Sequence, residues 1–169
     1  MVNISYFSKD QQIWLEQNLN ALQYRIQGIQ PLKEHADHRK YYRIITQRDS
    51  IICMQSSALF NLKQFIHSST LLKKSNIPVA NILATSTELG MSLLTDLGPT
   101  ALLSLAKTRN PDYIFYYQQS IDCLINWQQQ TPSTYNYPTY DHHKAGHDAQ
   151  LCLEWFCQNW AHTQLSKHQ

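Results

Sequence analysis

The sequence predicts an α+β fold, in which a five-stranded antiparallel sheet with one packed helix is followed by further helices. Several runs rich in Ile and Tyr alternate apolar and polar residues, the pattern of half-buried strands. In residues 59–74 the apolar positions recur every three or four residues, which is typical of an amphipathic helix. The length of 169 residues, with 43% hydrophobic and 15% charged residues, suits one folded domain or one and a half.

The elements follow one another in a definite order. A first helix over residues 10–22 opens with Asp10 as a plausible cap. Strands are expected in YRIQGIQPLKE (24–34) and on both sides of the turn QRDS (47–50) in RKYYRIITQRDSIICMQ (39–55). After the helix at 59–74 come two short strand-like runs, VANILATSTE (79–88) and LGMSLLTDLG (89–98), and then helices at about 100–107, 111–130 and 143–165.

Charge and composition exclude several classes of protein. The net charge of +2 gives no broad positive field to hold a nucleic acid. The first 30 residues carry no signal-peptide pattern, and no window approaches the roughly 20 apolar residues of a membrane span. We therefore expect a cytoplasmic protein without membrane or nucleic-acid partners, whose four cysteines are free thiols.

Three segments, in the right order, point to a family. HADHRKYYR (35–43) resembles the DASFRRYFR-like segment of bacterial phosphotransferases related to aminoglycoside kinases and to the amino-sugar (N-acetylmuramate and N-acetylglucosamine) kinases. IICMQSSA (51–58) resembles the third strand of that family, and NIPVANILATSTELGMSLLTDLG (76–98) resembles the stretch that ends in its Asp-Leu-Gly hinge. The later segment YDHHKAGHDAQLCLEWF (140–156) is also similar to the amino-sugar kinase branch.

This resemblance implies a kinase-like N-terminal lobe in residues 1–97 and a hinge with the start of a helical C-terminal lobe in residues 98–169. It implies ATP and Mg²⁺ as cofactors, and a hydroxyl of a sugar or aminoglycoside as the acceptor, with cell-wall amino-sugar recycling as one role. The His-Gly-Asp catalytic loop and the metal ligands of the family do not occur in this sequence. We expect no catalytic residue in this chain, which would be inactive alone unless a second chain or a dimer covers the missing lobe.

In the family, the turn over the nucleotide phosphates matches His35 to Tyr41. Here Arg39 and Lys40 are the candidate charge partners of the phosphates, together with backbone N–H groups. The alternative is that these cations line a solvated strand edge. His35 and Asp37 depart from the family pattern, and a carboxylate at 37 would repel phosphates unless it faces away.

Two further segments are assigned to the nucleotide. The third strand has Met54 and Gln55 where protein kinases carry a lysine that pairs with a helix glutamate, and the helix at 59–74 has no acidic residue. Met54 would line the adenine pocket or fill the core. The hinge would bind adenine through its extended backbone at Thr95, Asp96 and Leu97, although Asp-Leu-Gly-Pro also suits a simple turn.

The C-terminal segment contains candidate contacts to the acceptor sugar. By resemblance these are Asp141 and Asp148, with helix capping as the alternative for Asp141. His143 and His147, four residues apart with Cys152 nearby, have a spacing that Zn²⁺ can use, but solvated histidines on a helix face are an alternative.

Another class of function remains open, a noncatalytic nucleotide-binding or interaction module derived from a kinase lobe. The two hypotheses differ in what they expect for the packing of three aromatic side chains, Trp155, Phe156 and Trp160. If they pack on a missing lobe, the isolated chain should expose an apolar patch and dimerise or aggregate, whereas a settled module should be monomeric.

Overall fold

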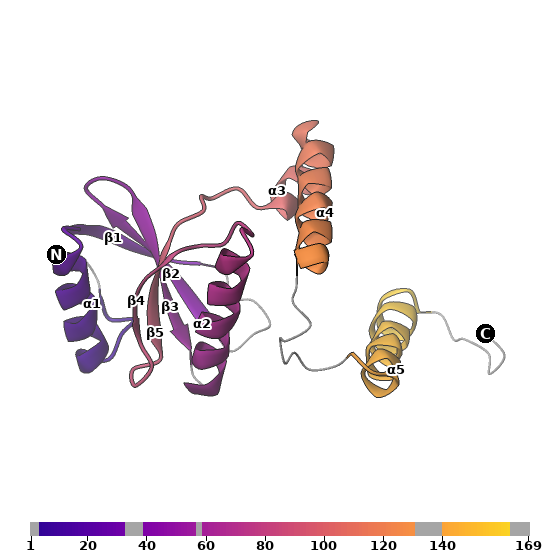
Figure 1. The fold of residues 1–169 in the computed structure, drawn as a ribbon, viewed down its shortest axis with the longest axis horizontal. Coiled ribbons are helices and arrows are strands. Elements are labelled where there is room, and N and C mark those ends of the chain that lie inside the picture. The colour runs from indigo at the N-terminus through magenta and orange to yellow at the C-terminus, as the bar shows by residue number, and fades with distance from the viewer. Residues whose placement is uncertain (1–3, 33–38, 57–58, 131–139, 163–169) are drawn as a thin grey trace. The chain divides into compact units, whose positions relative to one another are not determined.

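The structure is a computed structural model that describes residues 4–32, 39–56, 59–130 and 140–162 (Figure 1). The contacts divide the chain into two compact units, residues 1–131 and 132–169. The elements are α1 (Lys9–Ala21), β1 (Ile26–Pro31), β2 (Arg39–Thr46), β3 (Ser50–Ser56), α2 (Leu59–Lys74), β4 (Ile82–Ser86), β5 (Met91–Thr95), α3 (Leu102–Lys107), α4 (Asp112–Gln130), α5 (His142–Leu151) and the π-helix η1 (Cys152–Trp160).

The predicted α+β class and five-stranded antiparallel sheet are confirmed. The strands lie in the order β1-β2-β3-β5-β4, and every neighbouring pair is antiparallel. Because β5 lies between β3 and β4, the first three strands form a meander and the last two form a hairpin that joins it along β3.

Helix α1 begins at a different cap from the one that the sequence suggested. Ser8, not Asp10, is the N-cap: its hydroxyl accepts a hydrogen bond from the Gln11 backbone, and the Gln11 side chain accepts one from the Ser8 N–H. This reciprocal capping box satisfies two backbone donors at the helix start. Asp10 lies inside the first turn, where its charge favours the helix dipole.

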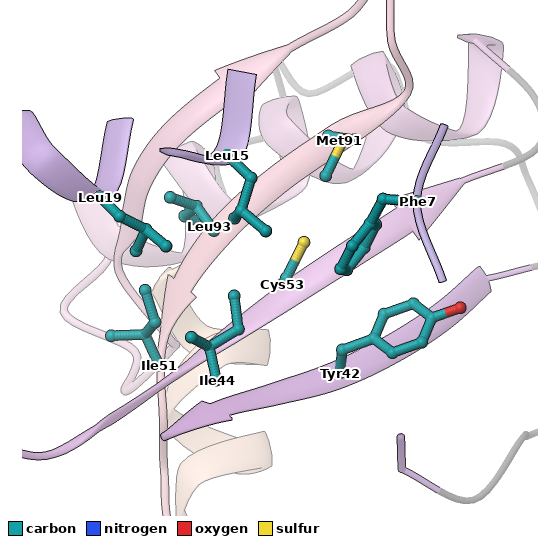
Figure 2. Packing of buried hydrophobic residues seen from close by; sticks show 9 residues of the cluster. All are labelled: Phe7, Leu15, Leu19, Tyr42, Ile44, Ile51, Cys53, Met91 and Leu93. Atoms are coloured by element: carbon teal, nitrogen blue, oxygen red, sulfur yellow. The ribbon is translucent and has the colours of Figure 1, made fainter. Parts of the chain in front are cut away.

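The two faces of the sheet carry separate cores. Helix α1 covers one face with Leu15 and Leu19, and Figure 2 shows these side chains gathered around Cys53 with Ile44, Ile51 and Leu93. Helix α2 covers part of the other face, where Leu62 packs with Met54 and Leu94. Successive residues of a strand point to opposite faces, so the alternation in β2 and β3 is what allows both cores to form.

A close approach links the end of β3 to the turn before β5. Gly90 has φ +65, and its carbonyl accepts a hydrogen bond of 2.8 Å from the Ser56 N–H. A Cβ at this position would collide with the Ser56 carbonyl oxygen. Only glycine meets both requirements without strain.

The later helices differ from the expectation at their ends. Helix α3 packs against α4, and both begin one or two residues later than predicted. The predicted helix from 143 to 165 is α-helical only to Leu151 and then widens into η1, where the Ala161 N–H donates to the Phe156 carbonyl five residues earlier. Leu165 lies outside the described residues.

No helix within residues 4–32, 39–56, 59–130 and 140–162 is long and apolar enough to cross a membrane.

Candidate functional site

A pocket of about 430 Å³ opens on the α2 side of the sheet, next to the segment that follows β5. This volume is within the usual range of roughly 300–1,000 Å³ for small-molecule sites. Its floor is apolar, and one wall is the backbone of residues 95–98, the segment that the sequence predicts to be a hinge. The lining residues are Leu32, Tyr41, Arg43, Ile52, Ala80, Leu94, Thr95, Asp96, Leu97 and Gly98.

Strand register explains why these residues meet. Arg43 pairs with Ile52, and Ile52 pairs in turn with Leu94, so three strands contribute one transverse row. Tyr41 lies two residues from Arg43 and therefore on the same face of β2. Helix α2 packs around Met54, and the row of Arg43, Ile52 and Leu94 lines the pocket.

Arg43 holds the hinge segment in place. Its Nε and Nη2 both donate to the Asp96 carboxylate, and Nη2 also donates to the Gly98 carbonyl at 3.0 Å. The Asp96 carboxylate further accepts a 2.6 Å hydrogen bond from the Ser50 hydroxyl and a 2.9 Å bond from the Gly98 N–H. The two charged side chains are only 17% and 7% exposed, so this ion pair is poorly screened by water.

These contacts change the pKa of Asp96. Burial alone pushes the pKa upward, but the hydrogen bonds from Arg43, Ser50 and the Gly98 backbone outweigh it, and the pKa lies below its ordinary value of 3.8. Asp96 is therefore ionised at neutral pH, and its side chain fixes the hinge backbone.

The three predicted hinge residues have different roles in this geometry. Thr95 is tied to Asn81, since its N–H donates to the Asn81 carbonyl and its hydroxyl accepts from the Asn81 N–H, both at 2.9 Å. Leu97 extends from the mouth of the pocket with 77% of its surface exposed. Within the described part of the chain, no hydrogen bond reaches the backbone N–H or C=O of Leu97.

Met54 fills the core and does not line the pocket. It is fully buried with Leu62 and Leu94, and the pocket-facing residues Tyr41 and Ile52 pack around it. Gln55, on the opposite face, donates to the Gln11 side chain at 2.8 Å and so connects β3 to α1. The position of a strand lysine is thus occupied by an apolar side chain.

The predicted phosphate turn is described only in part. His35 and Asp37 lie outside the described residues. Arg39 is half-buried, and its guanidinium lies 5.4 Å from the centre of the Phe65 ring on α2. Lys40 is exposed and alternates with Arg39 and Tyr41, so it belongs to the other face of β2.

The two candidate acceptor residues lie together in the second compact unit and have local partners. Asp141 is the N-cap of α5, with its carboxylate accepting from the Lys144 N–H at 2.9 Å. Asp148 accepts a 3.0 Å hydrogen bond from the Tyr140 hydroxyl, which raises the pKa of that tyrosine. The contact of Asp141 and Asp148 with a sugar remains a prediction.

The zinc interpretation has no ligand set in the described residues. Among the described residues, no three His, Cys, Asp or Glu side chains lie close enough together to hold a metal ion. His143 and His147 therefore do not belong to such a group there.

Sequence reasoning did not assign several residues of the pocket, namely Leu32, Arg43 as a hinge contact, Ile52, Ala80 and Gly98. The signal for Arg43 and Ile52 was present, since each lies two residues from a predicted site residue on its strand, Tyr41 and Met54. Leu32 and Ala80 come from strand ends, and only the tertiary fold brings them to the pocket.

A wider hollow of about 1090 Å³ lies between the Asn76–Pro78 turn and the α3–α4 pair. Most of its lining side chains are polar, among them Asp112, Gln119 and Ser120. Its lining does not include the segment 95–98, which the sequence assigns to adenine, so the smaller pocket is the better candidate for a planar base.

Comparison with known proteins relates the chain to a curated kinase. No established family profile matches the chain, and no solved structure matches it. The chain is 26% identical over 152 residues to the N-acetylmuramate/N-acetylglucosamine kinase of Pseudomonas putida. The match covers 85% of this chain and 44% of that kinase, so the chain spans less than half the length of this curated relative. The similarity, together with a five-stranded antiparallel sheet and helices compatible with a kinase-like lobe, relates this chain to kinases.

Proposed function

We propose that this chain is the nucleotide-binding part of an ATP-dependent phosphotransferase of the aminoglycoside phosphotransferase type, acting on a hydroxyl of a sugar or aminoglycoside. A role in cell-wall amino-sugar recycling follows from the same resemblance. The observation that carries the proposal is the pocket in which the segment 95–98 borders an apolar floor on the sheet.

The pocket suits the chemistry of adenine. Tyr41, Ile52 and Leu94 offer apolar surface for the faces of a planar base. The backbone of Leu97 offers one donor and one acceptor, the pair that an adenine edge requires. The Arg43–Asp96 ion pair holds that backbone in place before the ligand arrives.

Phosphoryl transfer also needs Mg²⁺ and a group that orients the acceptor hydroxyl. When bound, ATP supplies the transferred phosphoryl group and Mg²⁺ neutralises its charge. We propose that the metal ligands and the base lie outside residues 1–169, and that Asp141 and Asp148 contribute contacts to the acceptor. The exposed aromatic side chains Trp155, Phe156 and Trp160 (68%, 55% and 73% exposed) would then pack on the part that carries the catalytic loop, in a second chain or dimer.

Calorimetric titration of the chain with ATP and Mg²⁺ tests the nucleotide site. We expect micromolar to millimolar binding, and we expect Ala80→Trp to abolish it by filling the pocket. Ala21→Trp, at the exposed end of α1, is the matched control and should bind like the unaltered chain. Equal binding by both variants would place the nucleotide elsewhere.

The second candidate, a noncatalytic nucleotide-binding or interaction module, is favoured by one observation, the burial of Met54 in place of a strand lysine. The two candidates differ in the behaviour of the chain and in turnover. A monomeric chain that binds ATP, and that transfers no phosphoryl group to an amino sugar or aminoglycoside even when supplied with any natural partner chain, would favour the module.

A further inference from the structure

Helix α4 carries an apolar stripe that remains exposed in the described part of the chain. Its five side chains, each between 43% and 63% exposed, recur at intervals of three or four residues: Ile114, Tyr117, Ile121, Leu124 and Ile125. Half-buried residues of α4 such as Tyr113 and Trp127 lie on a different side of the helix. We propose that this α4 stripe binds the same stripe of a second copy of the chain, so that two α4 helices pack antiparallel in a dimer.

The side of α4 that faces the rest of the first compact unit is polar. Asp112, Gln119 and Asn126 line the wide hollow described above. At 3.6 residues per turn, these three residues lie on the side of the helix opposite Ile121. A helix that packs only within its own chain turns its apolar side inward. The reversed arrangement in α4 indicates that its apolar side is an interface with another molecule.

The spacing of the α4 stripe suits a second copy of the same helix. Ile114, Tyr117, Ile121 and Leu124 are separated by three, four and three residues, a heptad-type spacing that reads the same in both directions. When two such helices pack antiparallel about a twofold axis, Tyr117 of each copy lies opposite Ile121 of the other. Ile114 then lies opposite Leu124, so every apolar position of the repeat meets an apolar partner.

Charge favours the antiparallel alignment over the parallel one. The charged residues of α4 are Asp112 and Asp122, and neither belongs to the stripe. Parallel packing would place Asp112 of both copies at the same level and align the two helix dipoles, whereas antiparallel packing separates these carboxylates and opposes the dipoles. A stripe without charge also offers a different protein no ionic contact by which to recognise it.

The size of the α4 stripe predicts a weak dimer. Five half-exposed side chains of these types present roughly 300 Å² of apolar surface on each copy. A standard specific interface buries about 800 Å² on each partner, part of it in a polar rim such as Gln118 and Gln128 would supply. We therefore expect dimers in equilibrium with monomers, with a dissociation constant of about 10–100 µM.

Sedimentation equilibrium of the full 169-residue chain, at concentrations from about 5 to 200 µM, measures this association. Ile121→Glu should weaken the dimer by roughly tenfold or more, because it buries an unpaired carboxylate at the centre of the interface. Phe115→Glu is the matched control, since it makes the same kind of change at an apolar residue of α4 that is 57% exposed on another side of the helix. It should dimerise like the unaltered chain.

A mixing experiment tests the antiparallel alignment. Tyr117→Lys should also weaken the dimer when it is the only chain present. An equimolar mixture of the Ile121→Glu and Tyr117→Lys chains should recover the affinity of the unaltered chain to within roughly threefold, because the new carboxylate and ammonium groups lie opposite each other. In a parallel dimer position 121 would face position 121, and the mixture would stay monomeric.

An unaltered chain that stays monomeric up to about 200 µM would overturn the dimer and leave the stripe to a different partner chain. A dimer that persists in Ile121→Glu, or an equal loss in Phe115→Glu, would overturn the role of the α4 stripe, and a monomeric mixture would overturn the antiparallel alignment. If Ile121→Glu fails to fold by circular dichroism, Ile114→Glu supplies the same comparison. The measurements contain no nucleotide, so failure of the proposed ATP site would leave this result unchanged.

Discussion

The Asp96 carboxylate accepts two hydrogen bonds from the Arg43 guanidinium, although the two residues are 53 positions apart in the chain. This ion pair connects β2 to the segment after β5 across the intervening strand β3. Replacing Asp96 with asparagine should lower the free energy of unfolding by about 2 kcal/mol, since a charge-assisted pair is lost from a poorly exposed site. Urea unfolding measures the change, and Glu16→Gln on the exposed face of α1 is the control, with little expected effect. An equal loss in both variants would contradict a special role for the ion pair.

The same ion pair makes the free energy of unfolding depend on pH. The pKa of Asp96 in the folded chain lies below its ordinary value of 3.8, so the unfolded chain takes up a proton first as the pH falls. The stabilisation by Asp96 is complete above pH 3.8 and is lost as the pH falls through the lower folded pKa. The difference in unfolding free energy between the unaltered chain and Asp96→Asn should therefore shrink below pH 3.8. A difference that stays constant down to the acid transition would show that Asp96 is not the titrating group.

Substitution of two glycines should have opposite effects. Gly90→Ala should destabilise the chain by about 1–3 kcal/mol, because its φ of +65 disfavours a side chain and the added Cβ meets the Ser56 carbonyl. Gly146→Ala, in the interior of α5 with open space around it, should increase helix stability by about 0.5–1 kcal/mol. Thermal melts followed by circular dichroism measure both. A neutral Gly90→Ala would mean that the turn before β5 rearranges.

The cysteines should differ in reactivity. Burial raises the pKa of the Cys53 thiol to about 12, so it stays protonated and enclosed at neutral pH. Cys152 is exposed. A thiol reagent should label Cys152 in the folded chain and reach Cys53 only after unfolding, with the modified residues identified by mass spectrometry and Cys152→Ser as the control that removes the label at that position. Rapid labelling of Cys53 in native buffer would contradict a closed core on the α1 face.

The sheet and α2 could be predicted from the sequence because their patterns are local. Residues 39–55 alternate since each face of the sheet meets a different core, and α2 has the bounds that its apolar spacing predicted. The Ser8 cap was also encoded locally, as Ser8 and Gln11 three residues apart, but Asp10 offered a competing acceptor.

The pocket depended on information that no local pattern holds. Arg43 and Asp96 meet only because β5 enters the sheet beside β3, and that choice of neighbour is a property of the whole sheet. Met54 could line a pocket or fill the core, and the position of α2 decided in favour of the core. The resemblance to amino-sugar kinases assigned residues 95–97 to a hinge, and these residues line the pocket, but the resemblance did not show which groups hold that segment in place.

The strand order also has a consequence for the route by which the chain folds. The meander β1-β2-β3 and the hairpin β4-β5 each contain contacts between near neighbours in sequence, so each can form rapidly. The pairing of β3 with β5 brings together residues such as Cys53 and Leu93, which are separated in sequence by the whole of α2 and by β4. Closing this long loop costs more conformational entropy than closing the short turns within the meander or the hairpin. We therefore expect the docking of the hairpin onto the meander to limit the folding rate, so that truncating Leu93 slows folding while truncating Ile29 on edge strand β1 mainly speeds unfolding.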